Sequence, residues 1–268
     1  MFPDFVQRPP WWGGDLQTLR NALVGRPEDL NTFPPERLVL PLRDGSGDRL
    51  AASLHRPPRR TERPRVVLIH GLTGSEASLY ILQSAAVLLA RGYPVLRLNL
   101  RGAGPSRPLC RFQYHAGRTS DLVDALAALP DDVTQYGLLV VAFSLGGNML
   151  LKFLGEGGRA GLRGAVVVSA PLDLAGSARR LMARRNRLYH RFLLAQMKRE
   201  SLAGGDVPPA ERATIGSVRS ILAFDDRLTA PRNGFAGAAD CAFCASSACF
   251  FAAASASRLA LASKALLL

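Results

Sequence analysis

A short turn of small residues around Ser144 has the clearest chemical potential in the chain. Residues 140–148 have the sequence VVAFSLGGN, an apolar run followed by a serine and two glycines. Small residues two positions before and after a serine, here Ala142 and Gly146, permit the tight strand-to-helix turn of a nucleophile elbow. That turn lifts the hydroxyl above the sheet and lets the N–H of Leu145 face a developing oxyanion. The pattern predicts Ser144 as a nucleophile in acyl transfer; the alternative is a glycine-rich turn with an incidental serine.

A second loop, upstream of the serine, offers the other half of an oxyanion hole. An apolar run at residues 65–69 leads into the sequence HGLTG at residues 70–74. An HG loop after a buried strand supplies a second backbone donor, here most naturally the N–H of Leu72. We expect His70 to hold this loop rather than to act in catalysis. The loop and the serine turn together are more specific for acyl transfer than either is alone.

Alternating strand and helix patterns must position these residues. Apolar runs bounded by turn residues predict strands, and apolar spacings of three and four predict the helices between them. This alternation indicates the α/β class, with a mostly parallel sheet and helices on both faces. We expect a hairpin at residues 36–55 around a turn at 44–47, strands at 65–69, 93–100, 137–143 and 164–169, and helices at 78–91, 119–129 and 146–154.

Composition limits the classes of protein and partner. The chain has 268 residues, 48% hydrophobic and 21% charged, which excludes a disordered or fibrous protein and predicts a sizeable core. Lys and Arg number 34 against 21 acidic residues, and the net charge of +13 suits nucleic acid or an anionic membrane. No nucleic-acid motif accompanies this charge, and two Trp and five Tyr offer few stacking partners, so no specific nucleic acid is expected.

Residues 179–199 carry much of the positive charge. They contain eight Lys or Arg and no acid, and their apolar residues are spaced as in an amphipathic helix. The apolar positions are Leu181, Leu188, Phe192 and Ala195. We expect this helix to form a lid, with Leu188 and Phe192 over an acyl pocket and the arginines in water. Peripheral contact with an anionic membrane is the alternative, because arginines favour anionic headgroups.

Several motifs, in order and at compatible spacing, resemble the YheT-like branch of the α/β-hydrolases. The similarity spans about residues 2–235 and is carried by PPWW at 9–12, LQTL at 16–19, HGLTGS at 70–75, RGAG at 101–104, YHAG at 114–117, FSLGGN at 143–148 and FDDRLTAP at 224–231. The resemblance implies an α/β-hydrolase domain over residues 1–235, with a helical cap inserted at about 173–235. It also implies a serine esterase that acts on small-molecule or lipid carboxylic esters, with no cofactor and no metal.

The resemblance further implies an acid and a histidine after the serine, in the order Ser…Asp/Glu…His. No histidine follows His190 and no acid follows Asp240. Residues 236–268 instead hold thirteen alanines, five serines and three cysteines. We expect this segment to be a frame-shifted or divergent end that replaces the last strands. The catalytic machinery is then incomplete as encoded, and the hydrolase is either inactive or limited to weak residual turnover from the oxyanion hole. Asp173 and His190 have the formal order of a triad with Ser144, but a solvated or cap-packing His190 is the preferred interpretation.

The two other histidines are expected away from the chemistry. His115 lies in the YHAG motif and is expected to be structural, and His55 lies among prolines and arginines that predict a loop. Asp225 and Asp226, in the cap motif, are expected in salt bridges or helix caps.

The cysteines and the apolar runs do not indicate a metal site, redox chemistry or a membrane segment. Cys241 and Cys244 have CxxC spacing, but without a nearby histidine or a βαβ context we do not expect zinc or redox chemistry. Residues 1–10 lack the basic start and apolar run of a signal peptide, and no run is long and apolar enough to span a membrane. A cytoplasmic location is therefore expected.

Overall fold

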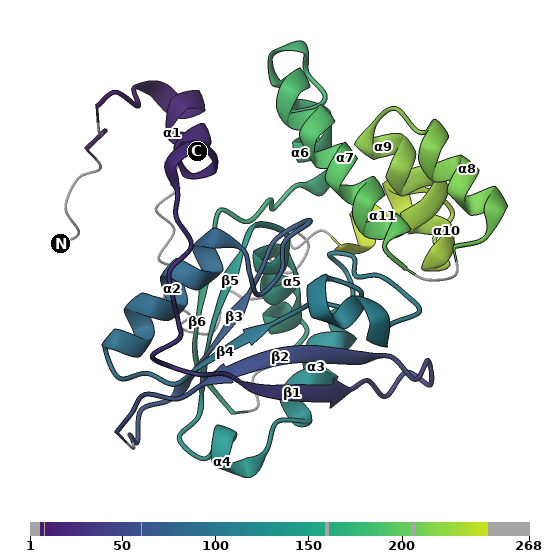
Figure 1. The fold of residues 1–268 in the computed structure, drawn as a ribbon. Coiled ribbons are helices and arrows are strands. Elements are labelled where there is room, and N and C mark those ends of the chain that lie inside the picture. The colour runs from purple at the N-terminus through teal and green to yellow at the C-terminus, as the bar shows by residue number, and fades with distance from the viewer. Residues whose placement is uncertain (1–5, 8, 60, 159–160, 205–206, 246–268) are drawn as a thin grey trace.

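A six-stranded mixed sheet forms the centre of the molecule (Figure 1). The computed structural model describes residues 6–7, 9–59, 61–158, 161–204 and 207–245. The strand order is β1-β2-β4-β3-β5-β6; β1, β2 and β4 pair antiparallel, whereas β4, β3, β5 and β6 run parallel. The strands are β1 (Glu36–Pro41), β2 (Arg49–His55), β3 (Arg65–Ile69), β4 (Val95–Leu98), β5 (Leu138–Phe143) and β6 (Leu162–Val168).

Helices cover both faces of this sheet. Helix α2 (Leu79–Ala90) packs on one face, where Ile81, Ala85 and Leu89 join one apolar cluster. Helices α3 (Ser120–Ala127) and α5 (Ser144–Gly155) pack on the other face, within a larger cluster. The predicted α/β class, with a mostly parallel sheet between two helical layers, is confirmed. Helix α1 (Gly13–Val24) lies outside these layers (Figure 1), and α4 (Asp131–Thr134) adds Val133 to the larger cluster.

Burial along the strands explains why apolar runs predicted them. Every residue of the central strand β3 is buried, and so is every residue of β4, because parallel strands between two helical layers have no solvent face. Strand β6 is only partly buried, and Val166 is 46% exposed. Within the described residues, β6 forms the edge of the sheet.

A second group of helices follows β6 and lies beside the carboxyl ends of the parallel strands (Figure 1). These are α6 (Leu174–Leu181), α7 (Arg187–Leu202), α8 (Pro209–Ser217), α9 (Ile221–Phe224), α10 (Ala230–Arg232) and α11 (Ala238–Ala245). Helices α6 to α9 share an apolar cluster of their own, which includes Leu194, Met197, Ile215 and Ile221. A π-helical turn, Asp225–Thr229, connects α9 to α10. We call α6 to α11 the cap.

The basic segment differs from the lid helix that its spacing predicts. A 3₁₀ turn at Arg184–Asn186 divides it into α6 and α7. Leu188 is 78% exposed and Phe192 is 61% exposed, so the expectation that they face an acyl pocket is wrong. The break shifts the helical phase of α7 relative to one continuous helix, so that Leu194 and Met197 turn inward instead.

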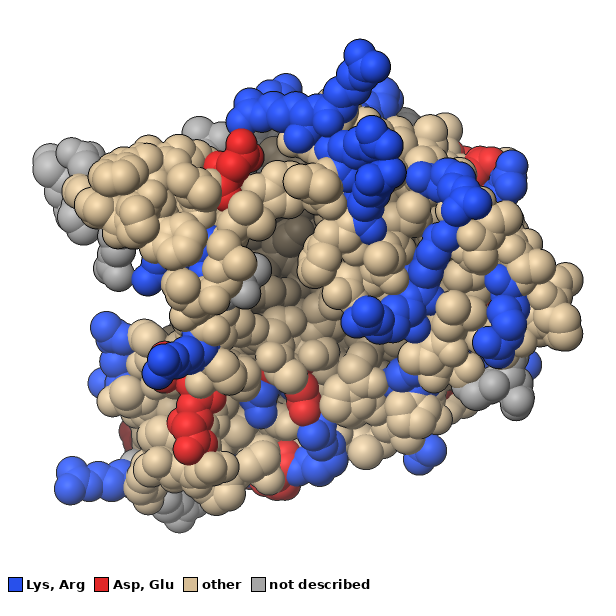
Figure 2. All heavy atoms as spheres, turned by 45° about the horizontal axis from the view of Figure 1, so that its top comes forward, with Lys and Arg blue, Asp and Glu red and all other residues tan. Residues whose placement is uncertain are grey.

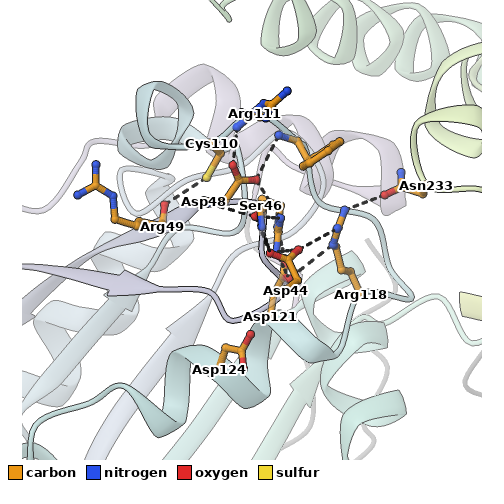
Figure 3. A network of polar contacts seen from close by, with 12 residues as sticks. Asp44, Ser46, Asp48, Arg49, Cys110, Arg111, Arg118, Asp121, Asp124 and Asn233 are labelled. Carbon is orange, nitrogen blue, oxygen red and sulfur yellow. Dashed lines mark hydrogen bonds and ion pairs between the residues drawn. The ribbon is translucent and has the colours of Figure 1, made fainter.

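A buried ionic network ties the β1–β2 hairpin to the rest of the sheet (Figure 3). The Arg101 side chain is fully buried and lies between three carboxylates. Its guanidinium nitrogens are 2.8 Å from Asp44, 2.9 Å from Asp48 and 2.8 Å from Asp121. A buried charge is tolerated only when it is paired, so Arg101 requires all three of these carboxylates to be in place.

The same network reaches the loop before α3 and the cap. Asp48 accepts hydrogen bonds from the backbone N–H groups of Arg111, at 2.7 Å, and Phe112, at 3.2 Å. Arg118 contacts Asp44 at 3.3 Å and donates to the Asn233 side chain of the cap at 2.8 Å (Figure 3). The network therefore holds the segment around residues 111–118 between the sheet and the cap.

The alanine-rich segment begins as a helix. Helix α11 packs Ala238 and Cys241 inward, with both side chains buried. Residues 246–268 lie outside the described part of the chain, and so does the prediction of a frame-shifted end that replaces the last strands. Among the described helices, none has the length and apolarity that crossing a membrane requires.

Candidate active site

Ser144 stands at a strained turn between β5 and α5. Its φ is +51°, a left-handed conformation that L-residues with a side chain adopt at an energetic cost. Phe143 before it is extended, and α5 begins at Ser144 itself. A Cβ atom on Gly146 would lie 2.3 Å from the carbonyl oxygen of His70, so only glycine allows α5 to approach the neighbouring loop this closely. The structure thus contains the predicted sharp turn, with the Ser144 side chain exposed.

The HG loop packs directly against this turn. A Cβ atom on Gly71 would lie 2.8 Å from the Cβ of Ser144. His70 is fully buried; its Nδ1–H donates to the Gly71 carbonyl at 2.8 Å and its Nε2 accepts from the Leu100 N–H at 3.1 Å. Burial lowers the pKa of His70 to about 4. Both ring nitrogens are used within the loop, which agrees with the structural role expected for this histidine.

Two tyrosine hydroxyls hold the loop backbone on either side of Leu72. The Tyr80 hydroxyl accepts from the Gly71 N–H at 2.9 Å, and the Tyr114 hydroxyl accepts from the Thr73 N–H at 2.7 Å. The Leu72 N–H between them makes no hydrogen bond to any described residue. Leu145 lies in the first turn of α5, where N–H groups have no partner within the helix.

A large, mainly apolar cavity opens above the serine. Its volume is about 940 Å³, and Ser144, Leu72 and Leu145 all line it. Figure 2 shows a deep hollow on the face that carries the cap. The cap contributes most of the apolar wall through Leu174, Leu181, Leu193, Met197, Ile221 and Phe224. An apolar cavity of this size with a few polar groups fits a small organic or lipid-like molecule.

Two cap carboxyls also line the cavity. Burial raises the pKa of Glu200 on α7 to about 7 and the pKa of Asp225 to about 6. Glu200 accepts a hydrogen bond from the Tyr114 hydroxyl at 3.3 Å, and Asp225 accepts one from the Thr229 hydroxyl at 2.9 Å. Glu200 was not among the residues predicted for the site. Its only signal in the sequence is that it directly follows the acid-free basic stretch at residues 179–199.

The two aspartates of the cap motif have different surroundings. Asp226 accepts from the backbone N–H of Ala238 at 3.1 Å, which agrees with its expected capping role. Asp225 was also expected in a cap or a salt bridge. Its described hydrogen bond is instead to a neutral hydroxyl, and it faces the cavity.

All four histidines of the chain are engaged in hydrogen bonds, and none has the setting of a general base. His55 is buried in strand β2, so the predicted loop position is wrong; Nδ1 donates to the Phe33 carbonyl at 2.5 Å and Nε2 accepts from Arg97 at 3.0 Å. His115 lines the cavity, but its Nδ1 accepts from the Gly117 N–H at 3.2 Å, which leaves the proton of the neutral ring on Nε2. Burial lowers the pKa of His115 to about 4.

The formal triad of Ser144, Asp173 and His190 is not assembled. The Asp173 carboxylate accepts from the Gly176 N–H at 2.8 Å and caps α6. The Nε2 of His190 accepts from the Ile221 N–H at 3.1 Å. Neither side chain lines the cavity that contains Ser144. The preferred interpretation of His190 as a cap-packing residue agrees with this geometry.

No described group of three or more His, Cys, Asp or Glu side chains has a metal-binding arrangement. Cys241 is buried and lines the cavity, whereas the Cys244 side chain lies outside the described part of the structure. The arrangement around Ser144 is therefore defined by a strained serine, backbone N–H groups and an apolar cavity.

This fold and this serine turn define an α/β-hydrolase. The model of the family described as alpha/beta hydrolase fold matches residues 64–199, about half of the chain. The chain belongs to this family. "Putative esterase YheT" of Escherichia coli (strain K12) is 34% identical over 84% of the chain, which confirms the predicted resemblance to the YheT-like branch.

Other similarities are more distant. A Saccharomyces cerevisiae (strain ATCC 204508 / S288c) relative named "Monoacylglycerol lipase" is 26% identical over 66% of the chain. Among solved structures, the similarity to the Pyrococcus furiosus esterase PF2001 covers 63% of this chain and 61% of the esterase chain, with 19% identity and a TM-score of 0.49. The chain spans 66% of the length of the Escherichia coli relative and 42% of the Saccharomyces cerevisiae relative.

Proposed function

We propose that the chain carries the acyl-transfer site of a serine esterase, with Ser144 as the nucleophile and the N–H groups of Leu72 and Leu145 as the oxyanion hole. One observation supports this proposal most strongly. The exposed Ser144 is held at a φ of +51° under an apolar cavity, and the HG loop packed against it keeps the Leu72 N–H unpaired among the described residues.

In the proposed reaction, Ser144 Oγ forms a bond to the ester carbonyl carbon while its proton passes to a base. The carbonyl oxygen takes the electron pair of the double bond and is held by the two N–H groups. The bond to the alcohol oxygen then breaks, and the alcohol leaves with the proton. Water repeats the attack on the acyl-enzyme, which releases the carboxylic acid and restores the serine hydroxyl.

The described structure places no paired general base beside Ser144. Each of the four histidines already accepts a structural hydrogen bond at one ring nitrogen. Without a paired base, a serine hydroxyl loses several orders of magnitude in rate, while the oxyanion hole alone retains about 10³-fold acceleration over water. We therefore expect slow turnover by this chain, with solution bases accepting the proton.

The proposed substrates are carboxylic esters with an apolar acyl chain. The cavity holds about 940 Å³ above Ser144, and its cap wall is lined by aliphatic and aromatic side chains. Burial of such a chain stabilises the complex by about 25 cal/mol per Å² of apolar surface removed from water. The relative named "Monoacylglycerol lipase" supports a lipid ester as one member of this class.

The test is covalent labelling with a fluorophosphonate probe, which forms a bond to a nucleophilic serine as fluoride leaves. We expect slow labelling that imidazole accelerates, because imidazole supplies the missing base, and we expect Ser144→Ala to abolish it. Ser169→Ala is the matched control: Ser169 also has a positive φ, of +52°, and lines the same cavity, but it does not begin a helix. Labelling that survives Ser144→Ala or is lost in Ser169→Ala would contradict the assignment.

A non-catalytic α/β-hydrolase is the second candidate. The engagement of all four histidines favours it. It predicts no labelling of Ser144 at any imidazole concentration or at pH 9, although the protein is folded by circular dichroism. Labelling that depends on Ser144 would reject this candidate.

A further inference from the structure

Helix α7 exposes two large apolar side chains to solvent. Leu188 and Phe192 are separated by one helical turn, so they project from the same face, and they are 78% and 61% exposed. The opposite face of α7 carries Leu194 and Met197 into the cap core. This helix therefore has apolar residues on both faces, one of which the described residues leave uncovered.

Arginines surround the exposed pair. Arg184, Arg187 and Arg191 lie within one turn of Leu188 or Phe192, and the whole stretch 179–199 contains no acid. Figure 2 shows Lys and Arg side chains gathered on the face that contains the hollow. In the described chain, the single ion pair of this stretch joins Arg185 to Asp15. The other arginines of the stretch are not neutralised by carboxylates of the protein.

That ion pair brings α1 beside the start of α7. Arg185 contacts the Asp15 carboxylate at 3.2 Å, and the Tyr189 hydroxyl donates to the Asp15 carbonyl at 3.4 Å. Helix α1 also exposes apolar residues on one face. They are Leu16, Leu19 and Leu23, at positions i, i+3 and i+7, and Leu23 is 66% exposed. Two segments about 170 residues apart thus present apolar side chains on adjoining helices.

We propose that α1 and α7 form a docking surface for an anionic lipid bilayer. Exposed Leu and Phe side chains enter the boundary between headgroups and acyl chains, and flanking arginines pair with anionic headgroups. A second copy of the chain fits this surface less well, since the net charge of +13 makes two copies repel each other. Nucleic acid would pair with the arginines but would leave Leu188 and Phe192 without apolar contacts.

This surface adjoins the cavity through the same two cap helices. Leu181 on α6 and Leu193 on α7 line the cavity wall, while Leu188 and Phe192 project outward. A bilayer on the outer face of α7 would therefore lie close to the wall of the cavity. The docking proposal concerns binding alone and does not depend on the reactivity of Ser144.

The test is co-sedimentation of the whole chain with sucrose-loaded vesicles of phosphatidylglycerol or phosphatidylcholine. We expect binding to phosphatidylglycerol that weakens with salt, and weak binding to phosphatidylcholine. Arg187→Glu with Arg191→Glu should weaken binding at least about 25-fold, from about fivefold per arginine. Leu188→Ser with Phe192→Ser should weaken it at least about tenfold, because the inserted apolar surface is lost.

The control places one change of each kind on a different helix. Val87 is exposed on α2 and Arg91 follows α2 one turn later, so Val87→Ser with Arg91→Glu makes one apolar-to-polar change and one charge reversal away from the proposed surface. This control should bind as the unchanged chain does. The proposal is overturned if the unchanged chain ignores anionic vesicles, if both α7 variants bind normally, or if the control loses equal affinity. Gel filtration that shows a dimer sensitive to Leu188→Ser and Phe192→Ser would identify a second copy as the occupant instead.

Discussion

Replacement of Gly146 by alanine should separate the serine turn from the HG loop. An added Cβ would lie 2.3 Å from the His70 carbonyl oxygen and 2.9 Å from Ile69 Cγ2. Ordinary contact begins near 3.4 Å, so the loop backbone and α5 must move apart by about 1 Å. Backbone atoms of β3 and its loop cannot rotate away as a flexible side chain could, and the whole junction must shift.

The expected magnitude follows from two opposing effects. Overpacking of this kind costs about 1–3 kcal/mol, whereas alanine in a helix gains about 1 kcal/mol over glycine. We therefore expect Gly146→Ala to lower the free energy of unfolding by up to about 2 kcal/mol. A displacement of about 1 Å between reacting groups costs roughly 100-fold in rate, so fluorophosphonate labelling of Ser144 should fall by that factor.

Gly216→Ala is the matched control. Gly216 lies in α8, and an added Cβ there would meet no atom within 4 Å. This change should stabilise the chain by about 0.5–1 kcal/mol and leave labelling unaltered. Urea unfolding followed by circular dichroism measures the stability of both variants. A Gly146→Ala variant that is as stable as Gly216→Ala and is labelled at the rate of the unchanged chain would show that the junction tolerates the added Cβ.

Three further predictions concern the buried polar groups. Arg101→Met should lower the free energy of unfolding by about 3–5 kcal/mol, since it leaves buried carboxylates unpaired, whereas the exposed Arg91→Met should change it little; equal urea midpoints would contradict this. The pKa of Glu200 is raised to about 7 in the folded chain, so the unfolded chain releases this proton first and stability falls as pH rises from about 4.5 to 7. Glu200→Gln removes this loss of stability. Urea unfolding at pH 5 and pH 8 should therefore show that the variant is more stable relative to the unchanged chain at pH 8 than at pH 5. A stability difference that does not depend on pH would contradict the raised pKa. Tyr114→Phe removes the acceptor of the Thr73 N–H and should slow labelling of Ser144 while the far-ultraviolet spectrum stays unchanged; an unaltered rate would show that the loop does not need this bond.

The strands of the parallel sheet could be predicted because an apolar run can be recognised without knowing which face of the element is buried. Residues 65–69 form β3 with the predicted bounds, since an apolar run buried on both faces is apolar at every position. The serine turn was equally visible because its glycines are required sterically. A Cβ on Gly146 or Gly71 would collide with the facing backbone or with Ser144.

The cap was less predictable because its burial depends on packing between helices. Leu188 and Phe192 have the spacing of a buried face, but the 3₁₀ turn at Arg184–Asn186 changes which side of α7 meets α8 and α9. Glu200 and Asp225 gained their raised pKa values from the enclosure of the cavity, and no local pattern encodes that enclosure.

The hydroxyl of Tyr114 joins the cap to the loop below it, since it accepts from Thr73 and donates to Glu200. Because one oxygen atom makes both hydrogen bonds, the position of α7 and the order of the backbone beside Leu72 are thermodynamically linked. By reciprocity, a ligand that stabilises the loop beside Leu72 would also stabilise the contact between Tyr114 and α7 by the same free energy that this contact contributes to its binding.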